Sequence, residues 1–188
     1  MKKENVFVDP NVARKKKLGD VLETNKIDAN EPPLFSWIEF NLIGLCNRRC
    51  TFCPWSDPEW RSNHVPKVAG NNDILHLPVE VYTGVMKDLN KVGFKGGIIY
   101  SAFSEPFLYN HLEEVIKISK EQCPDSRIEV VTNGDFLTLE KLNTFFEAGL
   151  TRIDVSVYDG PEKVKPFEDL RAEAGLNKEQ FHIRERWY

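Results

Sequence analysis

Hydrophobic positions follow two different periods along the chain from about residue 34 onward. Five short runs are apolar or alternate with polar residues, which is typical of β-strands: residues 34–42, 97–100, 128–131, 153–157 and 181–184. Four stretches between them repeat apolar residues three and four positions apart, which predicts amphipathic helices: residues 78–92, 112–122, 139–148 and 161–174. Strands that alternate with helices predict right-handed βαβ crossovers, hence an α/β fold with a parallel sheet.

Two stretches lie outside this pattern. Residues 1–33 are polar, with a basic run at residues 14–17 and two prolines at the end. We expect a polar leader over residues 1–33 and one domain over residues 34–188. The leader is either a mobile or surface-draped segment or a docking segment for a partner or an acidic ligand. Residues 54–75 are rich in Pro, Asp, Asn and Gly, and a connection this long is expected to be functional or partly mobile.

Polar residues follow the predicted strands at their carboxyl ends. A cysteine-rich segment follows the first strand, Ser104 and Glu105 follow the second, Asn133 follows the third, and Ser156 lies near the end of the fourth. The carboxyl ends of parallel strands meet at one rim of a sheet, where active sites of such folds are found. The periodicity therefore predicts an active site at this rim.

The cysteine-rich segment contains Cys46, Cys50 and Cys53, spaced C-x-x-x-C-x-x-C. Thiolates are soft ligands that suit a soft metal ion or an iron–sulfur cluster. A closed structural zinc site needs four protein ligands, whereas a cubane cluster can keep one iron without a protein ligand. The spacing favours an open cluster, and zinc with His64 or His76 as a fourth ligand is the alternative.

Composition narrows the class of protein. A formal net charge of -4 argues against a general nucleic-acid binder, which is usually basic. No apolar run approaches the roughly 20 residues that span a bilayer, and no signal peptide is evident at the N-terminus. Clustered thiols without a disulfide framework fit a reducing compartment, and Cys123 is expected to be a buried structural thiol. We therefore predict a soluble, cytoplasmic protein that does not act at a membrane.

Four segments together resemble a known family. The run from Cys46 to Cys53, with Phe52 before the last cysteine, resembles the signature loop of the radical S-adenosylmethionine (radical SAM) enzymes. Residues 101–108 are similar to that family's Gly-Gly-Glu-Pro segment, residues 131–134 to its third-strand ending and residues 155–157 to its fourth strand. The resemblance covers about residues 37–157. It implies a partial (β/α) barrel of TIM-barrel type with parallel strands, although five strands are predicted here where the family core has six.

The resemblance also implies site residues. Cys46, Cys50 and Cys53 would ligate three irons of a 4Fe-4S cluster, and the fourth iron would bind S-adenosylmethionine (SAM). The other implied contacts to SAM are Phe52 near the adenine, Ser104 and Glu105 at the methionyl amino group, Asn133 and Ser156 at the ribose or the methionyl group, and Arg184, or alternatively Arg186, at the carboxylate.

The implied reaction is reductive cleavage of SAM to methionine and a 5′-deoxyadenosyl radical, which removes hydrogen from an unknown substrate. An electron donor of the flavodoxin or ferredoxin type would be a partner. Two departures leave alternatives open: Ala102, Phe103 and Ser104 replace the family's glycines, and the chain stops after the fifth predicted strand. The first alternative is a cluster-bearing but catalytically incomplete module that a partner chain or a second copy completes. The second is a zinc-stabilised interaction domain.

Overall fold

The computed structural model describes residues 36–57, 59 and 76–187. Within them, one parallel sheet has its strands in sequence order: β1 (Trp37–Phe40), β2 (Gly97–Tyr100), β3 (Arg127–Thr132), β4 (Arg152–Val157) and β5 (Phe181–Glu185). The connections contain the α-helices α3 (Val79–Lys91), α4 (Leu112–Gln122), α5 (Leu139–Glu147) and α6 (Val164–Glu173). They also contain the short 3-10 helices η2 (Pro54–Ser56), η4 (Pro106–Leu108) and η5 (Pro161–Lys163).

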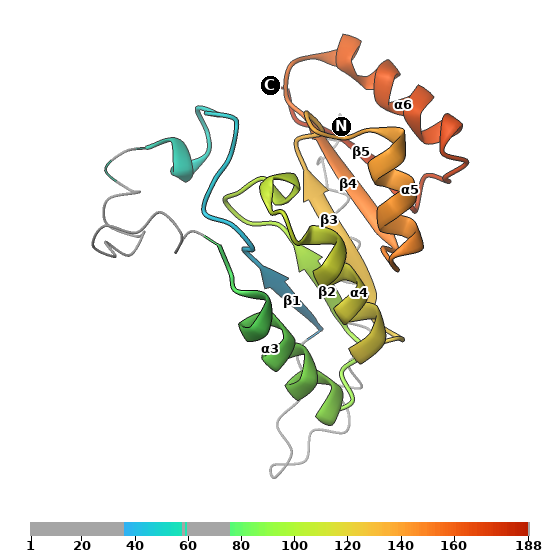
Figure 1. Ribbon diagram of the computed structural model, residues 1–188. Helices are drawn as coiled ribbons and strands as arrows, with labels where there is room; N and C mark the ends of the chain where they lie inside the picture. Colours follow the sequence, from blue (N-terminus) through green and yellow to red (C-terminus); the bar gives the residue numbers. More distant parts are fainter. Residues whose placement is uncertain (1–35, 58, 60–75, 188) are drawn as a thin grey trace, which may run out of the picture.

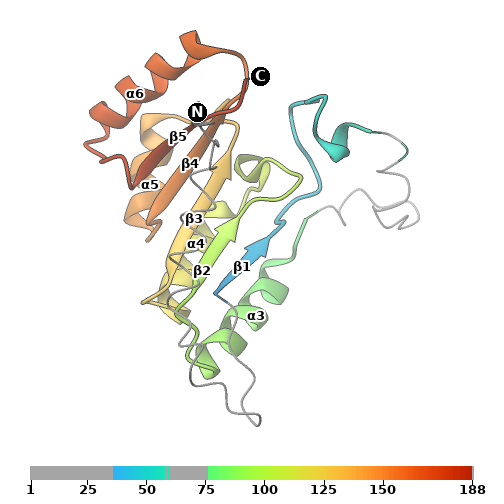
Figure 2. The same cartoon turned by 180° about the vertical axis from the view of Figure 1, so that it is seen from behind.

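The helices lie on one face of the sheet (Figure 1), and the view from behind shows the opposite face nearest the viewer (Figure 2). The segment that follows β1 extends beyond the carboxyl end of that strand in both views. This arrangement of parallel strands and crossover helices confirms the predicted α/β fold of partial-barrel type.

The core lies between the sheet and its helices. Side chains alternate along a strand, so Ile98, Ile128 and Ile153 point toward the helices and are fully buried. Glu129, Asp154 and Ser156 occupy the alternate positions and therefore point to the other face. The sheet thus packs an apolar face against the helices, and its other face carries polar residues together with Ile99 and Val131.

Three hydroxyl groups are buried in this core. The Tyr82 hydroxyl hydrogen-bonds to those of Tyr100 and Ser119, and the Tyr100 hydroxyl also donates to the Val115 carbonyl oxygen at 3.1 Å. Burial raises the pKa of Tyr82 to about 12, so its phenol stays neutral at neutral pH. The three side chains join α3, β2 and α4 through satisfied polar contacts.

Three differences from the sequence pattern have a structural reason. The first strand ends at Phe40 rather than at residue 42, because the chain leaves the sheet there and Ile43 makes an isolated antiparallel bridge to His76. Pro78 is the N-cap of α3 rather than its first residue. The helix expected over 161–174 is divided into η5 and α6, and Pro166 lies in the first turn of α6, where its missing N–H costs no hydrogen bond.

Two predictions concern residues outside this description. The leader over residues 1–33 lies outside the described residues, as does most of the segment 54–75. Among the helices that are described, none is long and apolar enough to cross a membrane.

Candidate active site

The cysteine loop, residues 41–53, joins β1 to η2. The Cys53 amide donates to the Cys50 carbonyl oxygen at 3.0 Å, which closes a turn around the second and third cysteines. The Glu105 amide donates to the Leu45 carbonyl oxygen at 2.9 Å and so joins the loop to the end of β2. Cys46, Cys50 and Cys53 are half-buried free thiols. The predicted position of this loop at the carboxyl end of β1 is therefore observed.

The protonation of two thiols depends mainly on their burial. Burial raises the pKa of the Cys46 and Cys50 thiols above the ordinary value. The Arg48 amide donates to the Cys46 Sγ at 3.4 Å, and the Arg48 charge acts on Cys50; both oppose the rise in pKa. A metal is bound by the thiolate, so metal binding would release protons from these groups.

A cavity that is partly open to solvent lies beside the loop at the carboxyl ends of the strands, and its empty space, open solvent included, is about 560 Å³. Eight residues singled out from the sequence line it: Cys46, Cys50, Phe52, Cys53, Ser104, Glu105, Asn133 and Ser156. These residues come from the loop and from the ends of β2, β3 and β4. The structure therefore brings these residues together at the carboxyl ends of the strands, as predicted, and the role of each residue stays a prediction.

Glu105 is the buried charge of the cavity, with 1% of its surface exposed. Its Oε1 accepts from the Thr132 hydroxyl at 2.7 Å and the Phe107 amide at 3.1 Å, and its Oε2 accepts from the Asn133 amide at 2.9 Å. Burial raises the pKa of Glu105, and these hydrogen bonds oppose that rise. A carboxylate has about four acceptor positions, and three are used here. One acceptor position remains for a ligand.

The other polar residues of the cavity also make hydrogen bonds. The Ser104 hydroxyl donates to Asn41 Oδ1 at 2.6 Å, and Asn133 Nδ2 donates to Asn47 Oδ1 at 2.8 Å. Ser156 is 2% exposed. The Asn133 side chain also makes a hydrogen bond to the Cys46 thiol. The Ser104 oxygen can still accept a hydrogen bond from a ligand.

Phe52 is 64% exposed, an unusual state for a large apolar side chain. Its ring lies against Tyr158, with the ring centroids 5.3 Å apart. Burial raises the pKa of the Tyr158 phenol, which keeps that ring neutral at the cavity wall. The two rings form an aromatic surface beside the cysteines.

Arg184 is not among the residues that line the cavity. It is paired in register with Ser156 on the neighbouring strand, so the two side chains point to the same face of the sheet. Asp154 and His182 bind each other, with His182 Nδ1 2.7 Å from Asp154 Oδ1. Both Arg152 Nε and Nη2 donate to the same carboxylate. Neither Asp154 nor His182 lines the cavity.

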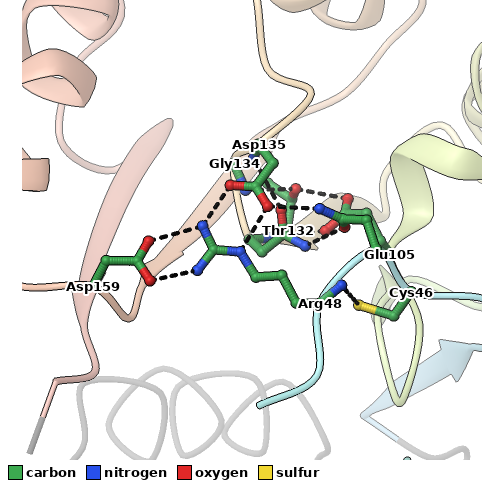
Figure 3. A network of polar contacts seen from close by, with 9 residues as sticks. Cys46, Arg48, Glu105, Thr132, Gly134, Asp135 and Asp159 are labelled. Atoms are coloured by element: carbon green, nitrogen blue, oxygen red, sulfur yellow. Dashed lines mark hydrogen bonds and ion pairs between the residues drawn. The ribbon is translucent and has the colours of Figure 1, made fainter.

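Sequence reasoning missed a polar network around Arg48 (Figure 3). Its Nε and Nη2 donate to the two carboxylate oxygens of Asp135 at 2.7 and 2.5 Å. Its Nη1 donates to Asp159 Oδ1 at 3.0 Å, and its Nη2 lies 2.9 Å from Asp159 Oδ2. Asn47 Nδ2 adds a hydrogen bond of 2.6 Å to Asp135 Oδ2. The network connects the cysteine loop to the residues after β3 and β4.

Gly134 adopts the backbone conformation that turns the chain from the end of β3 to Asp135. Its φ is 82°, and a Cβ at this position would lie 2.5 Å from the ring of Phe167. Only glycine fits such a position without strain. A signal for the network was present in the sequence, because Glu105, Asp135 and Asp159 follow three successive strands and two arginines lie in the cysteine loop. The sequence did not indicate which of these carboxylates each arginine binds.

Three thiols from one short loop line a single cavity, and this donor set suits a cluster. A single zinc ion needs its ligands around one point, whereas a cluster takes each thiolate on a different iron. Of the histidines considered for zinc, His76 does not line the cavity and His64 lies outside the described residues.

Comparisons with known proteins agree with this geometry. The family model described as the Radical SAM superfamily matches residues 40–179. An S-adenosyl-L-methionine-dependent 2-deoxy-scyllo-inosamine dehydrogenase of Niallia circulans is 31% identical over 127 residues, which are 68% of this chain and 46% of that protein. A GTP 3',8-cyclase of Aquifex aeolicus is 38% identical over 131 residues, which are 67% of this chain and 36% of that protein.

A solved structure has a similar fold. The crystal structure of BtrN in complex with AdoMet and 2-DOIA superposes with a TM-score of 0.64 and 27% sequence identity, over 80% of this chain and 56% of that chain. The present chain therefore spans less than half the length of the two curated relatives named above and about half that of the solved structure.

Proposed function

The chain belongs to the radical SAM superfamily, whose members use a 4Fe-4S cluster and SAM, and from that premise we propose that it binds both in the cavity beside the cysteine loop. Cys46, Cys50 and Cys53 hold the cluster as thiolates. The observation that carries the proposal is that these three thiols and the buried Glu105 carboxylate line one cavity at the carboxyl ends of the strands.

Glu105 binds the amino group of SAM in this proposal. An ammonium group offsets the cost of a buried carboxylate, and the fourth acceptor position of Glu105 is available to it. The carboxylate is held rigidly by the end of β3, so it is already oriented when the ligand arrives. The Ser104 hydroxyl, at the same strand end, is a second polar contact for the methionyl group.

The remaining contacts follow from the cavity wall. Phe52 and Tyr158 present the aromatic surface for the adenine. Asn133 and Ser156 contact the ribose or the methionyl group from the ends of β3 and β4. Arg184 is assigned to the methionyl carboxylate because it lies beside Ser156 and a guanidinium binds a carboxylate through two hydrogen bonds.

The cluster supplies the electron that breaks a carbon–sulfur bond of SAM, and the chain orients SAM and limits access of water to it. A reduced flavodoxin or ferredoxin in the cytoplasm is the proposed electron donor.

The two curated relatives named above act on an inosamine and on GTP according to their names, so kinship does not select a substrate here. A partner chain or second copy that continues the sheet beyond β5 stays a prediction.

Cleavage of SAM tests this proposal. We expect the full chain, reconstituted with iron and sulfide and then reduced, to release 5′-deoxyadenosine and methionine in equal amounts. Cys50→Ala should release neither, because it removes a cluster ligand. Cys123→Ala is the matched control, since that buried thiol lies in the core away from the cavity and should leave cleavage unchanged. Wild-type protein that holds a full cluster and never cleaves SAM would contradict the proposal.

A further inference from the structure

The cysteine loop has little regular backbone structure to hold it in place. No helix or strand is assigned to residues 44–53. Backbone hydrogen bonds join Leu45 to Glu105 and Cys53 to Cys50, one on each side of the segment between the first two cysteines. Within that segment, Asn47 and Arg48 connect to other strands through their side chains. The position of the first two thiols therefore depends on side-chain contacts.

We infer that Arg48 is a positioning residue that holds the cysteine loop against the ends of β3 and β4 before a cluster is bound. Its guanidinium lies between the carboxylates of Asp135 and Asp159, one from each strand end (Figure 3). The expected order of the loop in the metal-free chain follows from this contact and does not require the proposed function. The expected effect of Arg48 on how firmly a cluster is held rests on the proposed function above.

The geometry makes this contact stronger than a typical surface ion pair. Isolated exposed pairs contribute little to stability, but a planar guanidinium that binds carboxylates through paired hydrogen bonds is more rigid. The side chain of Arg48 is 21% exposed, compared with 32% for Asp135 and 49% for Asp159. Solvent therefore screens the Asp135 contact less than the Asp159 contact, and Asp135 should be the more important partner.

The existing contacts of Arg48 also argue against a main role in holding an anionic substrate. Its guanidinium edges already face two carboxylates, and its Cζ lies 5.8 Å from the centroid of the Tyr158 ring. A substrate anion would have to displace at least one of these groups. The neighbouring Arg49 is exposed, and no ion pair joins it to another residue in the described part of the chain. Arg49 therefore carries the same charge in the same loop without the contact.

Hydrogen exchange of the metal-free full chain tests the inference. In Arg48→Gln, backbone amides of residues 46–53 should exchange about tenfold faster or more, because the loop opens more often once its tether is lost. Arg49→Gln is the matched control and should stay within about twofold of wild type. The exchange rates of the β3 amides should be the same as in wild type in both variants. Asp135→Asn should reproduce the effect, so the test survives if Arg48→Gln does not fold.

Loss of the cluster provides a second readout. After anaerobic reconstitution, Arg48→Gln should release iron to a chelator about tenfold faster than wild type. Arg48→Lys should lie between them, because lysine keeps the charge and lacks the planar fork. Unchanged loop exchange in both Arg48→Gln and Asp135→Asn would overturn the inference. A chain that never binds iron would refute the proposed function and leave the exchange result standing.

Discussion

Two polar networks of this molecule, one in the core and one at the rim of the sheet, differ in their surroundings. The hydroxyls of Tyr82, Tyr100 and Ser119 lie in an apolar core, and all three residues are fully buried. The charged groups of Arg48 and Asp135 lie at the rim of the sheet, where each is partly exposed. We expect the core network to contribute to the free energy of unfolding, and the rim network, as inferred above, to hold the cysteine loop in position. Substitutions should separate these two effects.

The largest effect is expected from the apolar face of the sheet. Ile128 is fully buried between β3 and the helices, so Ile128→Ala should lower the free energy of unfolding by about 2–5 kcal/mol. Leu45→Ala at the rim, where the side chain is 41% exposed, should lower it by less than about 0.5 kcal/mol. Urea unfolding measures both. Equal losses would mean that the rim is packed like the core.

The hydroxyl network should give the next largest effect. Tyr100→Phe removes a hydroxyl that contacts Tyr82, Ser119 and the Val115 carbonyl, and the lost hydrogen bonds should cost about 1–2 kcal/mol. The six-membered aromatic ring is kept, so no large cavity forms. Thermal unfolding followed by circular dichroism measures the loss. An unchanged midpoint would show that the network is energetically neutral.

Strain at the rim predicts a smaller change of opposite sign. Ala102, which lines the cavity, has a φ of 80°, a conformation that glycine adopts readily and alanine does not. Ala102→Gly should therefore raise the free energy of unfolding by about 0.5–1 kcal/mol. Ala172→Gly, in the exposed part of α6, should lower it by a similar amount because the backbone there is helical. Urea unfolding of the two variants measures both changes in the free energy of unfolding. Changes of the same sign in Ala102→Gly and Ala172→Gly would contradict the prediction.

Acid titration should give the smallest effect. The Arg48 guanidinium holds the pKa of Asp135 below the ordinary value of 3.8. A carboxyl whose pKa is lowered by folding contributes stability above its unfolded pKa and loses it as the pH falls through the folded value. Carbon-detected NMR should find the Asp135 midpoint below 3.8 in wild type and higher in Arg48→Gln. A midpoint that does not move would show that the two groups do not interact in solution.

The sequence predicted the regular part of the fold well. The second strand was placed at its observed bounds, and the other strands of the sheet overlap their predicted runs, because buried parallel strands and amphipathic helices leave a periodic pattern. The first strand was predicted to run two residues too far, because Leu42 is buried without being paired in the sheet. Burial alone does not distinguish a strand from a packed loop.

The sequence indicated which residues lie together in the cavity but not the contacts that hold the loop. The three cysteines and Glu105 were singled out because their residue types and their positions after strands carry chemical meaning. The pairing of Arg48 with Asp135 joins residues far apart in the chain, and no local pattern specifies such a contact. The positive φ of Ala102 was equally hidden, because alanine gives no signal for that conformation. Both depend on how the loops are folded against one another.

The central claim is that Cys46, Cys50 and Cys53 hold a cluster with one iron open to SAM. Electron paramagnetic resonance of the reduced, reconstituted full chain tests it most directly, together with iron analysis. We predict about four irons per chain, as a 4Fe-4S cluster requires, and a signal whose g-values change when SAM is added. A colourless protein with one zinc per chain, or a cluster signal that SAM leaves unchanged, would contradict the claim.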